Sequence, residues 1–264
     1  DFYRSLAALG VTQQNWLFAH LMGKEYGELY LENPTVHEDI LDEAKAIMEK
    51  VEAGEPLAYL LGESYFYGRV FHINPHVLIP RPETEGLVEL ALSLPWEKAL
   101  DLCTGSGVIA ISLALEGKKK GKQLHVDALD LSEEALAVAK ANGERLKADV
   151  NFFRSDLFSE VEDTYDLLIS NPPYVERAEV LTLPVGLYEP NLALDGGEDG
   201  LDVIEDLIQQ APHYLKEEGF LLLEIGENQG EEVLEMAKPY FYGTIKDDLA
   251  NKVRYFVGKK RKIC

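Results

Sequence analysis

After Pro95 the sequence alternates short apolar runs with longer amphipathic segments, and this alternation restricts the fold more than any other feature. The apolar runs have the length and composition of strands, and the segments between them repeat apolar residues with the period of an α-helix. Such repeats predict an α/β fold, a doubly wound and mostly parallel sheet of seven strands with helices on both faces. The strands are expected at 98–103, 124–130, 150–156, 165–171 and 219–226, with two more within 242–260, and the helices at 108–115, 132–146 (capped by Ser132) and 201–215.

Polar or glycine-rich stretches follow the first four of these strands. They are "DLCTGSG" at 101–107, Asp130, "SD" at 155–156 and "NPPY" at 171–174. The carboxyl ends of parallel strands meet at one edge of the sheet, where doubly wound proteins bind their ligands. We therefore expect these four stretches to surround one crevice.

Residues 1–62 predict a small helical domain. Apolar residues between Ile40 and Val51 recur on one helical face, and "QQNWLFAHLMG" at 13–23 forms a shorter amphipathic pattern that ends at Gly23. Nothing in this part suggests catalytic chemistry.

Residues 63–85 predict a β-hairpin linker. Aromatic and β-branched residues surround Asn74-Pro75, which indicates a turn near 74–76. A helix is expected from about Thr84, with Thr84 as its cap. Residues 86–264 then form the remaining domain.

Composition narrows the class of protein. Hydrophobic residues make up 46% and charged residues 27% of the chain, as in soluble globular proteins, and no apolar run approaches the roughly 20 residues that span a bilayer. A net charge of −22 disfavours a direct nucleic-acid partner, and the basic run "KKKGK" at 118–122 is interpreted as a solvated loop after a helix. Two cysteines, Cys103 and Cys264, are too few for a disulfide framework, which indicates the reducing cytoplasm. The lack of a spanning apolar run indicates that no membrane is a partner.

The stretch from Gly105 to Ala110 reads G-x-G-x-x-A between a strand and a helix. Its glycines allow a tight turn that a ligand can approach closely, and Asp130 at the end of the next strand can accept both hydroxyls of a ribose. A dinucleotide and S-adenosylmethionine both fit this pattern. Asp101 favours S-adenosylmethionine, because a carboxylate suits its positively charged methionine end and would repel a pyrophosphate.

The "NPPY" stretch ends a buried strand with a rigid turn, because two prolines fix two φ angles and remove two donors. A planar –NH₂ group is a poor nucleophile, so its methylation requires the nitrogen to be held in line and its two hydrogens to be accepted. The side-chain oxygen of Asn171 and the carbonyl of Pro172 can be those acceptors, and Tyr174 can stack on the planar group. The alternative is a structural Pro-Pro turn with a capping asparagine.

With these motifs the sequence resembles class I S-adenosylmethionine-dependent methyltransferases with an (N/D)PPY motif, and more narrowly the release-factor glutamine methyltransferases (the PrmC/HemK family). The similarity extends over nearly the whole chain. Its segments are "EPLAYLLGESYFYG" (55–68), "VLIPRPETE" (77–85), "DLCTGSG" (101–107), "SNPPY" (170–174), "YEPNLALDGGEDGLD" (188–202), "EIGENQG" (224–230) and "DLANKVR" (248–254).

The resemblance implies methylation of the glutamine amide in the Gly-Gly-Gln motif of peptide-chain release factors. It implies an SN2 transfer by a monomer without metal or covalent intermediate, with residues 1–62 recognising the release factor. The implied cofactor residues are Asp101, Cys103, Thr104, Gly105, Ser106, Gly107, Asp130, Asp156, Leu157 and Asn171. The implied substrate residues are Asn171, Pro172, Pro173, Tyr174, Phe66, Arg81 and Glu83, of which Asn171, Pro172 and Tyr174 are the catalytic ones.

Two positions depart from the family's pattern. Cys103 stands where the family usually has glycine, and we expect an extended backbone there, because a left-handed one would cost about 1–2 kcal/mol. Asn251 replaces a frequent glycine, and asparagine tolerates the left-handed conformation better than most residues.

Three other functions remain open at this point. An adenine methyltransferase acting on nucleic acid shares NPPY but would need a surface for its target, and the acidic composition disfavours DNA. A nucleoside-binding module without activity would bind the cofactor and no methyl acceptor. An NAD-dependent oxidoreductase lacks a defensible catalytic Tyr-Lys or His-acid spacing.

Overall fold

The computed structural model of the protein describes residues 6–7, 9–24, 26–32, 34–121, 124–180, 182 and 184–262. Contacts along the chain separate two compact units, which divide between Glu63 and Ser64. Lys122 and Cys264, two residues named above, lie outside the described residues. The treatment of residues 63–85 as a separate linker stays a prediction.

The N-terminal unit contains α2 (Val11–Leu21), α3 (Tyr26–Glu32), α4 (Glu38–Glu52) and α5 (Leu57–Leu61). Its apolar core includes the buried side chains of Leu17 of α2 and of Ala44 and Met48 of α4. Gly23 follows α2 with a φ of 61°, a left-handed conformation that ends helices and suits glycine. The helical prediction for this part of the chain is confirmed.

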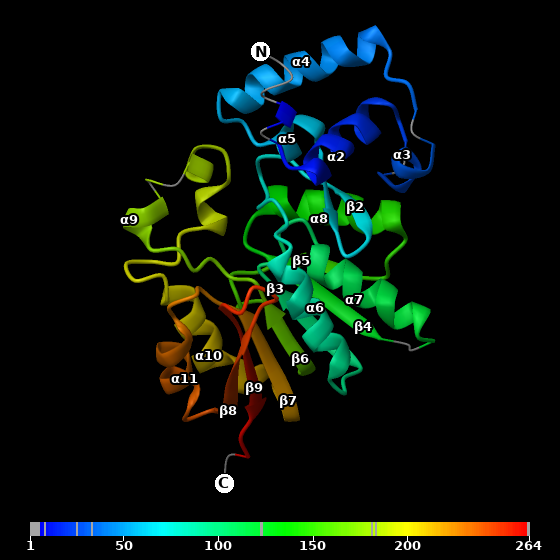
Figure 1. Ribbon diagram of the computed structural model, residues 1–264. Helices are drawn as coiled ribbons and strands as arrows, with labels where there is room; N and C mark the ends of the chain where they lie inside the picture. Colours follow the sequence, from blue (N-terminus) through cyan, green and yellow to red (C-terminus); the bar gives the residue numbers. More distant parts are fainter. Residues whose placement is uncertain are drawn as a thin grey trace. The chain divides into compact units, whose positions relative to one another are not determined.

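The second unit is built on a seven-stranded sheet with the order β5-β4-β3-β6-β7-β9-β8 (Figure 1). Neighbouring strands from β5 to β7 are parallel, and β9 runs antiparallel to both β7 and β8. β4 and β6 flank β3, so the chain changes direction across the sheet at β3. The strands are β3 (Lys98–Leu102), β4 (His125–Asp130), β5 (Asn151–Arg154), β6 (Tyr165–Ser170), β7 (Leu215–Glu224), β8 (Phe241–Asp247) and β9 (Val253–Lys260).

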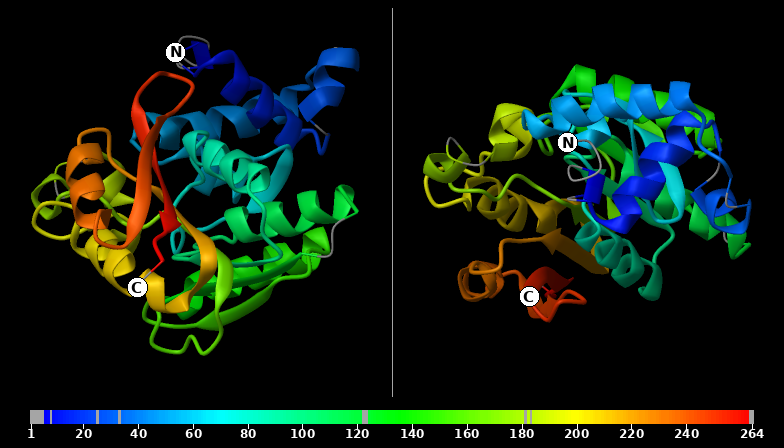
Figure 2. Two further views of the ribbon diagram at one scale, coloured as in Figure 1. Left: turned by 90° about the horizontal axis from the view of Figure 1, so that it is seen from below. Right: turned by 45° about the horizontal axis from the view of Figure 1, so that its top comes forward.

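Helices cover both faces of this sheet, as predicted (Figure 2). Side chains alternate along β3: Ala99 is buried in a cluster with α6 and α7, whereas Leu100 and Leu102 are buried in a cluster with α10 and α11. One face carries α6 (Glu83–Ser93), α7 (Val108–Lys119) and α8 (Glu133–Leu146), and the other carries α10 (Asp202–Tyr214) and α11 (Gly230–Ala237). The sheet thus has two separate apolar layers.

Between β6 and α10, the described residues form three short helices. They are α9 (Arg177–Val180), η1 (Pro184–Leu187) and η2 (Asn191–Ala193). Ser132 caps α8 as predicted, because its hydroxyl accepts a hydrogen bond from the Ala135 N–H at 3.1 Å. The helix α11 was not predicted.

The hairpin exists, but the predicted position of its turn was wrong. β1 (Glu63–Phe66) and β2 (Arg69–His72) are joined by Tyr67 and Gly68, whose φ angles are 49° and 72°. Two consecutive positive φ angles match the twist of a two-residue hairpin. Asn74 instead forms a local turn after β2, in which its side chain accepts from the His76 N–H at 3.0 Å.

Three smaller predictions can also be compared with the structure. Thr84 does not cap α6, which begins one residue earlier; its hydroxyl instead donates to buried Glu224 at 2.7 Å. Lys118 and Lys119 belong to the last turn of α7 and not to a loop. Asn251 has a φ of 59°, the left-handed conformation that asparagine was expected to tolerate. Within the described ranges, no helix is long and apolar enough to cross a membrane.

Candidate active site

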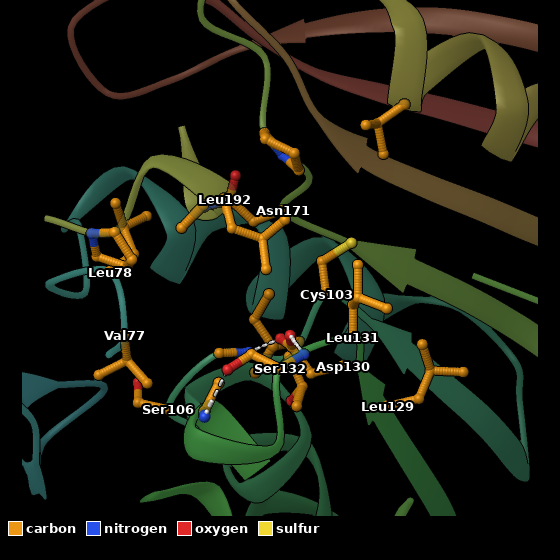
Figure 3. A pocket seen from close by; sticks show the side chains of 18 of the residues that line it. Val77, Leu78, Cys103, Ser106, Leu129, Asp130, Leu131, Ser132, Asn171 and Leu192 are labelled. Atoms are coloured by element: carbon orange, nitrogen blue, oxygen red, sulfur yellow. Dashed lines mark hydrogen bonds between the residues drawn. The ribbon is translucent and has the colours of Figure 1, made fainter. Parts of the chain in front are cut away.

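A cavity of about 470 Å³ lies at the carboxyl ends of β3, β4, β5 and β6. In Figure 3, side chains from these strand ends, among them Cys103, Asp130 and Asn171, surround it. The predicted residues that line it are Cys103, Thr104, Gly105, Ser106, Asp130, Asp156, Leu157, Asn171, Pro173 and Arg81. All four stretches that were expected to surround one crevice do so.

The glycine-rich turn is held from below by a buried carboxylate. Asp101 accepts hydrogen bonds from the Thr104 hydroxyl at 2.6 Å and from the Ala110 N–H at 3.2 Å. Gly105 has a φ of 55°, and a Cβ added there would meet no atom within 4 Å. The turn therefore presents bare backbone to open space, as the close approach of a ligand requires. Asp101 itself does not line the cavity, so its direct contact with a cofactor stays a prediction.

The burial of Asp101 makes stability depend on pH. Burial raises its pKa from 3.8 to about 7, although the hydrogen bonds from Thr104 and Ala110 lower it. Between these two pH values the folded chain holds a proton that the unfolded chain has released, so stability falls as pH rises through this window. We expect Asp101→Asn to lack this decrease in stability, because an amide does not titrate in this pH range. The amide oxygen can still accept both hydrogen bonds, so the turn keeps its support.

Urea unfolding at pH 4.5 and at pH 8 measures this effect. The decrease in the free energy of unfolding should be larger in the wild type than in the variant by at least about 1 kcal/mol. Equal decreases in the two proteins would show that Asp101 titrates normally.

Cys103 contradicts the expected extended backbone, since its φ is 58°. The chain must turn sharply between the end of β3 and the start of α7, and this turn sets the sign of φ whatever residue occupies it. A left-handed conformation costs a non-glycine residue about 1–2 kcal/mol. Burial and the nearby Asp130 carboxylate raise the pKa of the Cys103 thiol, so the thiol stays protonated.

Comparing Cys103→Gly with Cys103→Ala isolates this strain, because both variants lack the thiol and only the second has a Cβ. The glycine variant should be the more stable by about 1 kcal/mol in chemical unfolding. An alanine variant as stable as the glycine variant would show that the position is unstrained.

Asp130 is fixed at the end of β4 by two backbone donors. Its Oδ2 accepts from the Gly105 N–H at 2.8 Å, and its Oδ1 accepts from the Ser132 N–H at 3.0 Å. Burial raises its pKa, and these hydrogen bonds lower it. The carboxylate retains further lone pairs and lines the cavity, so it can accept hydroxyl groups of a ligand there.

The third strand end contributes a tight turn at residues 155–157. The buried Ser155 hydroxyl donates to the Leu157 carbonyl at 2.7 Å and accepts from the Glu160 N–H at 3.1 Å. Leu157 has a φ of 44°, again left-handed, and its side chain lines the cavity with Asp156. An apolar side chain beside a carboxylate is a surface suited to a purine with its amino group.

Asn171, the first residue of NPPY, is connected to a buried network. Its Nδ2 donates to the Thr84 hydroxyl at 3.2 Å, and that hydroxyl donates to Glu224 Oε2 at 2.7 Å. Among the residues that the structure describes, none donates a hydrogen bond to Asn171 Oδ1. This oxygen is therefore available as an acceptor at the cavity.

Tyr174, the last residue of NPPY, is bound to the same carboxylate. Its hydroxyl donates to Glu224 Oε1 at 3.2 Å, and its carbonyl accepts from Gln229 Nε2 at 3.0 Å. Gln229 also donates to the Gly200 carbonyl at 3.1 Å. A Cβ on Gly200 would lie 2.4 Å from the Tyr174 carbonyl oxygen, so this glycine is required for the close approach. Burial raises the pKa of Tyr174, which keeps the phenol protonated.

An ion pair joins two segments that border the cavity. Arg81 Nη2 lies 2.5 Å from Oε2 of Glu189, which is buried, and the other oxygen of Glu189 accepts from the Ile79 N–H at 3.1 Å. The segments on either side of this pair both line the cavity. Cavity residues that sequence reasoning missed include His76, Val77, Leu78, Thr84, Leu129, Leu131, Asn191 and Leu192.

Some predicted site residues do not line the cavity. Phe66 is fully buried and packs edge-on against Phe71, which places it in the core instead of at the mouth. Glu83 is exposed, and its carbonyl accepts from the Tyr255 hydroxyl at 2.5 Å. The other predicted residues outside the cavity lining are Asp101, Gly107, Pro172 and Tyr174.

The residues present fit S-adenosylmethionine. Asp130 offers a fixed carboxylate for ribose hydroxyls, and Gly105 leaves open space beside it. Leu131 and Leu157 supply apolar surface in the same cavity. Oδ1 of Asp101 is a buried oxygen without a hydrogen-bond partner among the described residues, which leaves one unused acceptor beneath the turn.

The strand order and the crevice at the reversal point define the class I methyltransferase fold, which solved structures share. A methyltransferase from Pyrococcus furiosus matches with a TM-score of 0.56 at 19% identity, over 84% of this chain and 99% of that chain. A 16S rRNA N2 G1207 methyltransferase from Thermus thermophilus, solved with AdoMet and guanosine, matches with a TM-score of 0.54 at 17% identity, over 75% and 50% of the two chains.

Sequence comparisons narrow the class to a family. Residues 12–62 match the PrmC N-terminal domain, and residues 84–184 match the methyltransferase small domain. A release factor glutamine methyltransferase of Streptococcus pneumoniae is 37% identical over 90% of this chain and 81% of its own length. One from Neisseria gonorrhoeae is 43% identical over 85% of this chain and 84% of its own length. The chain belongs to the release factor glutamine methyltransferase family.

Proposed function

We propose that this chain uses S-adenosylmethionine to methylate the side-chain amide nitrogen of the glutamine in the Gly-Gly-Gln motif of peptide-chain release factors. The names of its relatives support this function. The observation that carries the proposal is the orientation of Asn171: Thr84 holds its amide nitrogen, which leaves Oδ1 as an acceptor at the cavity. An acceptor of this kind suits the –NH₂ group of a substrate amide.

The cofactor site consists of the strand ends that line the cavity. Asp130 accepts the ribose hydroxyls, Asp156 and Leu157 hold the adenine, and residues 103–107 lie beside the methionine and ribose. Bound there, S-adenosylmethionine supplies an electrophilic methyl group. Asp101 supports this site from beneath the turn through Thr104 and Ala110.

The acceptor site consists of the NPPY turn. Asn171 Oδ1 and the Pro172 carbonyl accept the two hydrogens of the glutamine amide, and Pro173 and Tyr174 complete the surface. Because the lone pair of an amide nitrogen is delocalised, holding the nitrogen in one position is the main contribution of these residues. No strong base is needed in advance, since the nitrogen becomes acidic as its new bond forms and loses its proton late.

The partner is the release factor itself, recognised by the helical N-terminal unit, whose residues 12–62 match the PrmC N-terminal domain. The protein acts as a monomer in the cytoplasm, without a membrane partner. A direct nucleic-acid partner is disfavoured by the net charge of −22.

Transfer of labelled methyl groups from S-adenosylmethionine tests this function. The acceptors are a purified release factor, the same factor with its Gly-Gly-Gln glutamine changed to alanine, and a DNA duplex. Label on the unmodified factor alone is the expected result. Label on the duplex would instead make NPPY an adenine site and overturn the proposal.

A further inference from the structure

The buried carboxylate of Glu224 is connected to both ends of the NPPY motif, directly to Tyr174 and through Thr84 to Asn171. It lies at the end of β7, next to β6, and is 1% exposed. Its Oε2 accepts from Thr84, which in turn holds Asn171, and its Oε1 accepts from Tyr174. Glu224 is not among the residues that line the cavity, so it has no direct route to a substrate there.

We propose that Glu224 is a positioning residue that sets the orientation of the Asn171 amide through the single hydroxyl proton of Thr84. This inference rests on the proposed function of the NPPY site. A threonine hydroxyl has one proton, and Thr84 donates it to Glu224 at 2.7 Å. Its oxygen can then only accept from Asn171, and only the Nδ2 end of the amide can donate.

The opposite orientation of Asn171 is disfavoured by the same proton. If its oxygen faced Thr84, two acceptors would meet with no proton between them, since the hydroxyl proton is already donated. Such an unsatisfied contact costs about 1–3 kcal/mol. The carboxylate thus keeps Oδ1 directed away from Thr84, where it can accept a hydrogen of the glutamine amide.

The pKa of the Glu224 carboxyl is raised overall, and its two oxygens lie where they accept from the Thr84 and Tyr174 hydroxyls. Burial raises its pKa, whereas the hydrogen bonds from Thr84 and Tyr174 and the positive charge of Arg254 on β9 lower it. The negative charge of Glu83 on α6 also raises the pKa of Glu224. Arg254 is itself held by Asp248 at 3.4 Å and donates to the Ile225 carbonyl at 3.3 Å.

Glu224→Gln tests the inference because it keeps the shape and adds a donor. The new side-chain amide at position 224 can donate to Thr84. The Thr84 hydroxyl proton is then free to be donated to Asn171, which allows the Asn171 amide to flip. We expect kcat to fall by about 10–100-fold, as when an orienting hydrogen-bond partner is lost from a metal site. KM for the release factor and Kd for S-adenosylmethionine should stay near the wild-type values.

Two variants of Thr84 distinguish positioning from a merely structural role. Thr84→Val removes the hydroxyl at nearly constant shape and should lower kcat as much as Glu224→Gln. Thr84→Ser keeps the hydroxyl, so its kcat should stay near the wild-type value. Combining Thr84→Val with Glu224→Gln should add little further loss, because both act through one chain of hydrogen bonds. Thr84→Val also tests the inference if Glu224→Gln does not fold.

Asn171→Ala, measured beside these variants, separates the possible failures. If Asn171→Ala is inactive while Thr84→Val keeps wild-type kcat, or if the losses from Thr84→Val and Glu224→Gln multiply, the positioning role is wrong and the proposed function stands. If Asn171→Ala itself keeps wild-type kcat, the function assigned to the NPPY site fails as well.

Discussion

Asn171→Ala should lower turnover with a release factor by about 10²–10³-fold, the loss that follows removal of one preorganised hydrogen-bonding group at a reacting centre. The structure gives the reason: Thr84 fixes the amide nitrogen of Asn171, and its oxygen is left available at the cavity. Binding of S-adenosylmethionine should change little, because Asp130 and the glycine-rich turn are untouched. Single-turnover methyl transfer and calorimetric titration measure the two quantities separately.

A matched control is Asn228→Ala, because Asn228 is an exposed asparagine outside the cavity lining. It should turn over like the wild type. Wild-type turnover by Asn171→Ala, or an equal loss in both variants, would contradict the role assigned to Asn171.

Asp130→Ala should raise the Kd of S-adenosylmethionine by about 100-fold. Two hydrogen bonds from ribose hydroxyls to a carboxylate contribute about 3 kcal/mol together, and a factor of ten in affinity corresponds to about 1.4 kcal/mol. The truncation also leaves the N–H groups of Gly105 and Ser132 without their acceptor, which loosens the turn. Isothermal titration calorimetry checks this value.

Asp149→Ala is the control for charge, since it removes one carboxylate from an exposed position outside the cavity lining. Its Kd should equal that of the wild type. An Asp130→Ala variant that binds S-adenosylmethionine within about threefold of the wild type would place the ribose elsewhere.

Local patterns predicted most of the second unit. The strands from β3 to β7 are short apolar runs bounded by turn residues, so their positions follow from period and composition. The strand-end rule then brought Asp130 and Asn171 together, although 41 positions separate them in the sequence. The glycines of "DLCTGSG" and the prolines of "NPPY" indicated the turns after two of these strands, because few other residues adopt the backbone conformations of tight turns.

The failures lie where the local sequence pattern does not decide the structure. The hairpin turn lies at Tyr67 and Gly68, where both φ angles are positive, and Asn74-Pro75 gave a stronger but misleading local signal. The role of Thr84 depends on Glu224, which is 140 positions away. The backbone of Cys103 is left-handed because the path of the chain from β3 to α7 requires it. A cysteine side chain does not indicate this conformation in the sequence.

Tandem mass spectrometry of a release factor treated with the enzyme and isotopically labelled S-adenosylmethionine tests the central claim most directly. The expected result is one labelled methyl group on the side-chain nitrogen of the Gly-Gly-Gln glutamine, present with the wild-type enzyme and lost with Asn171→Ala. Label on another residue of the factor, or label that persists with Asn171→Ala, would contradict the assignment of this cavity as a glutamine-amide methyltransferase site.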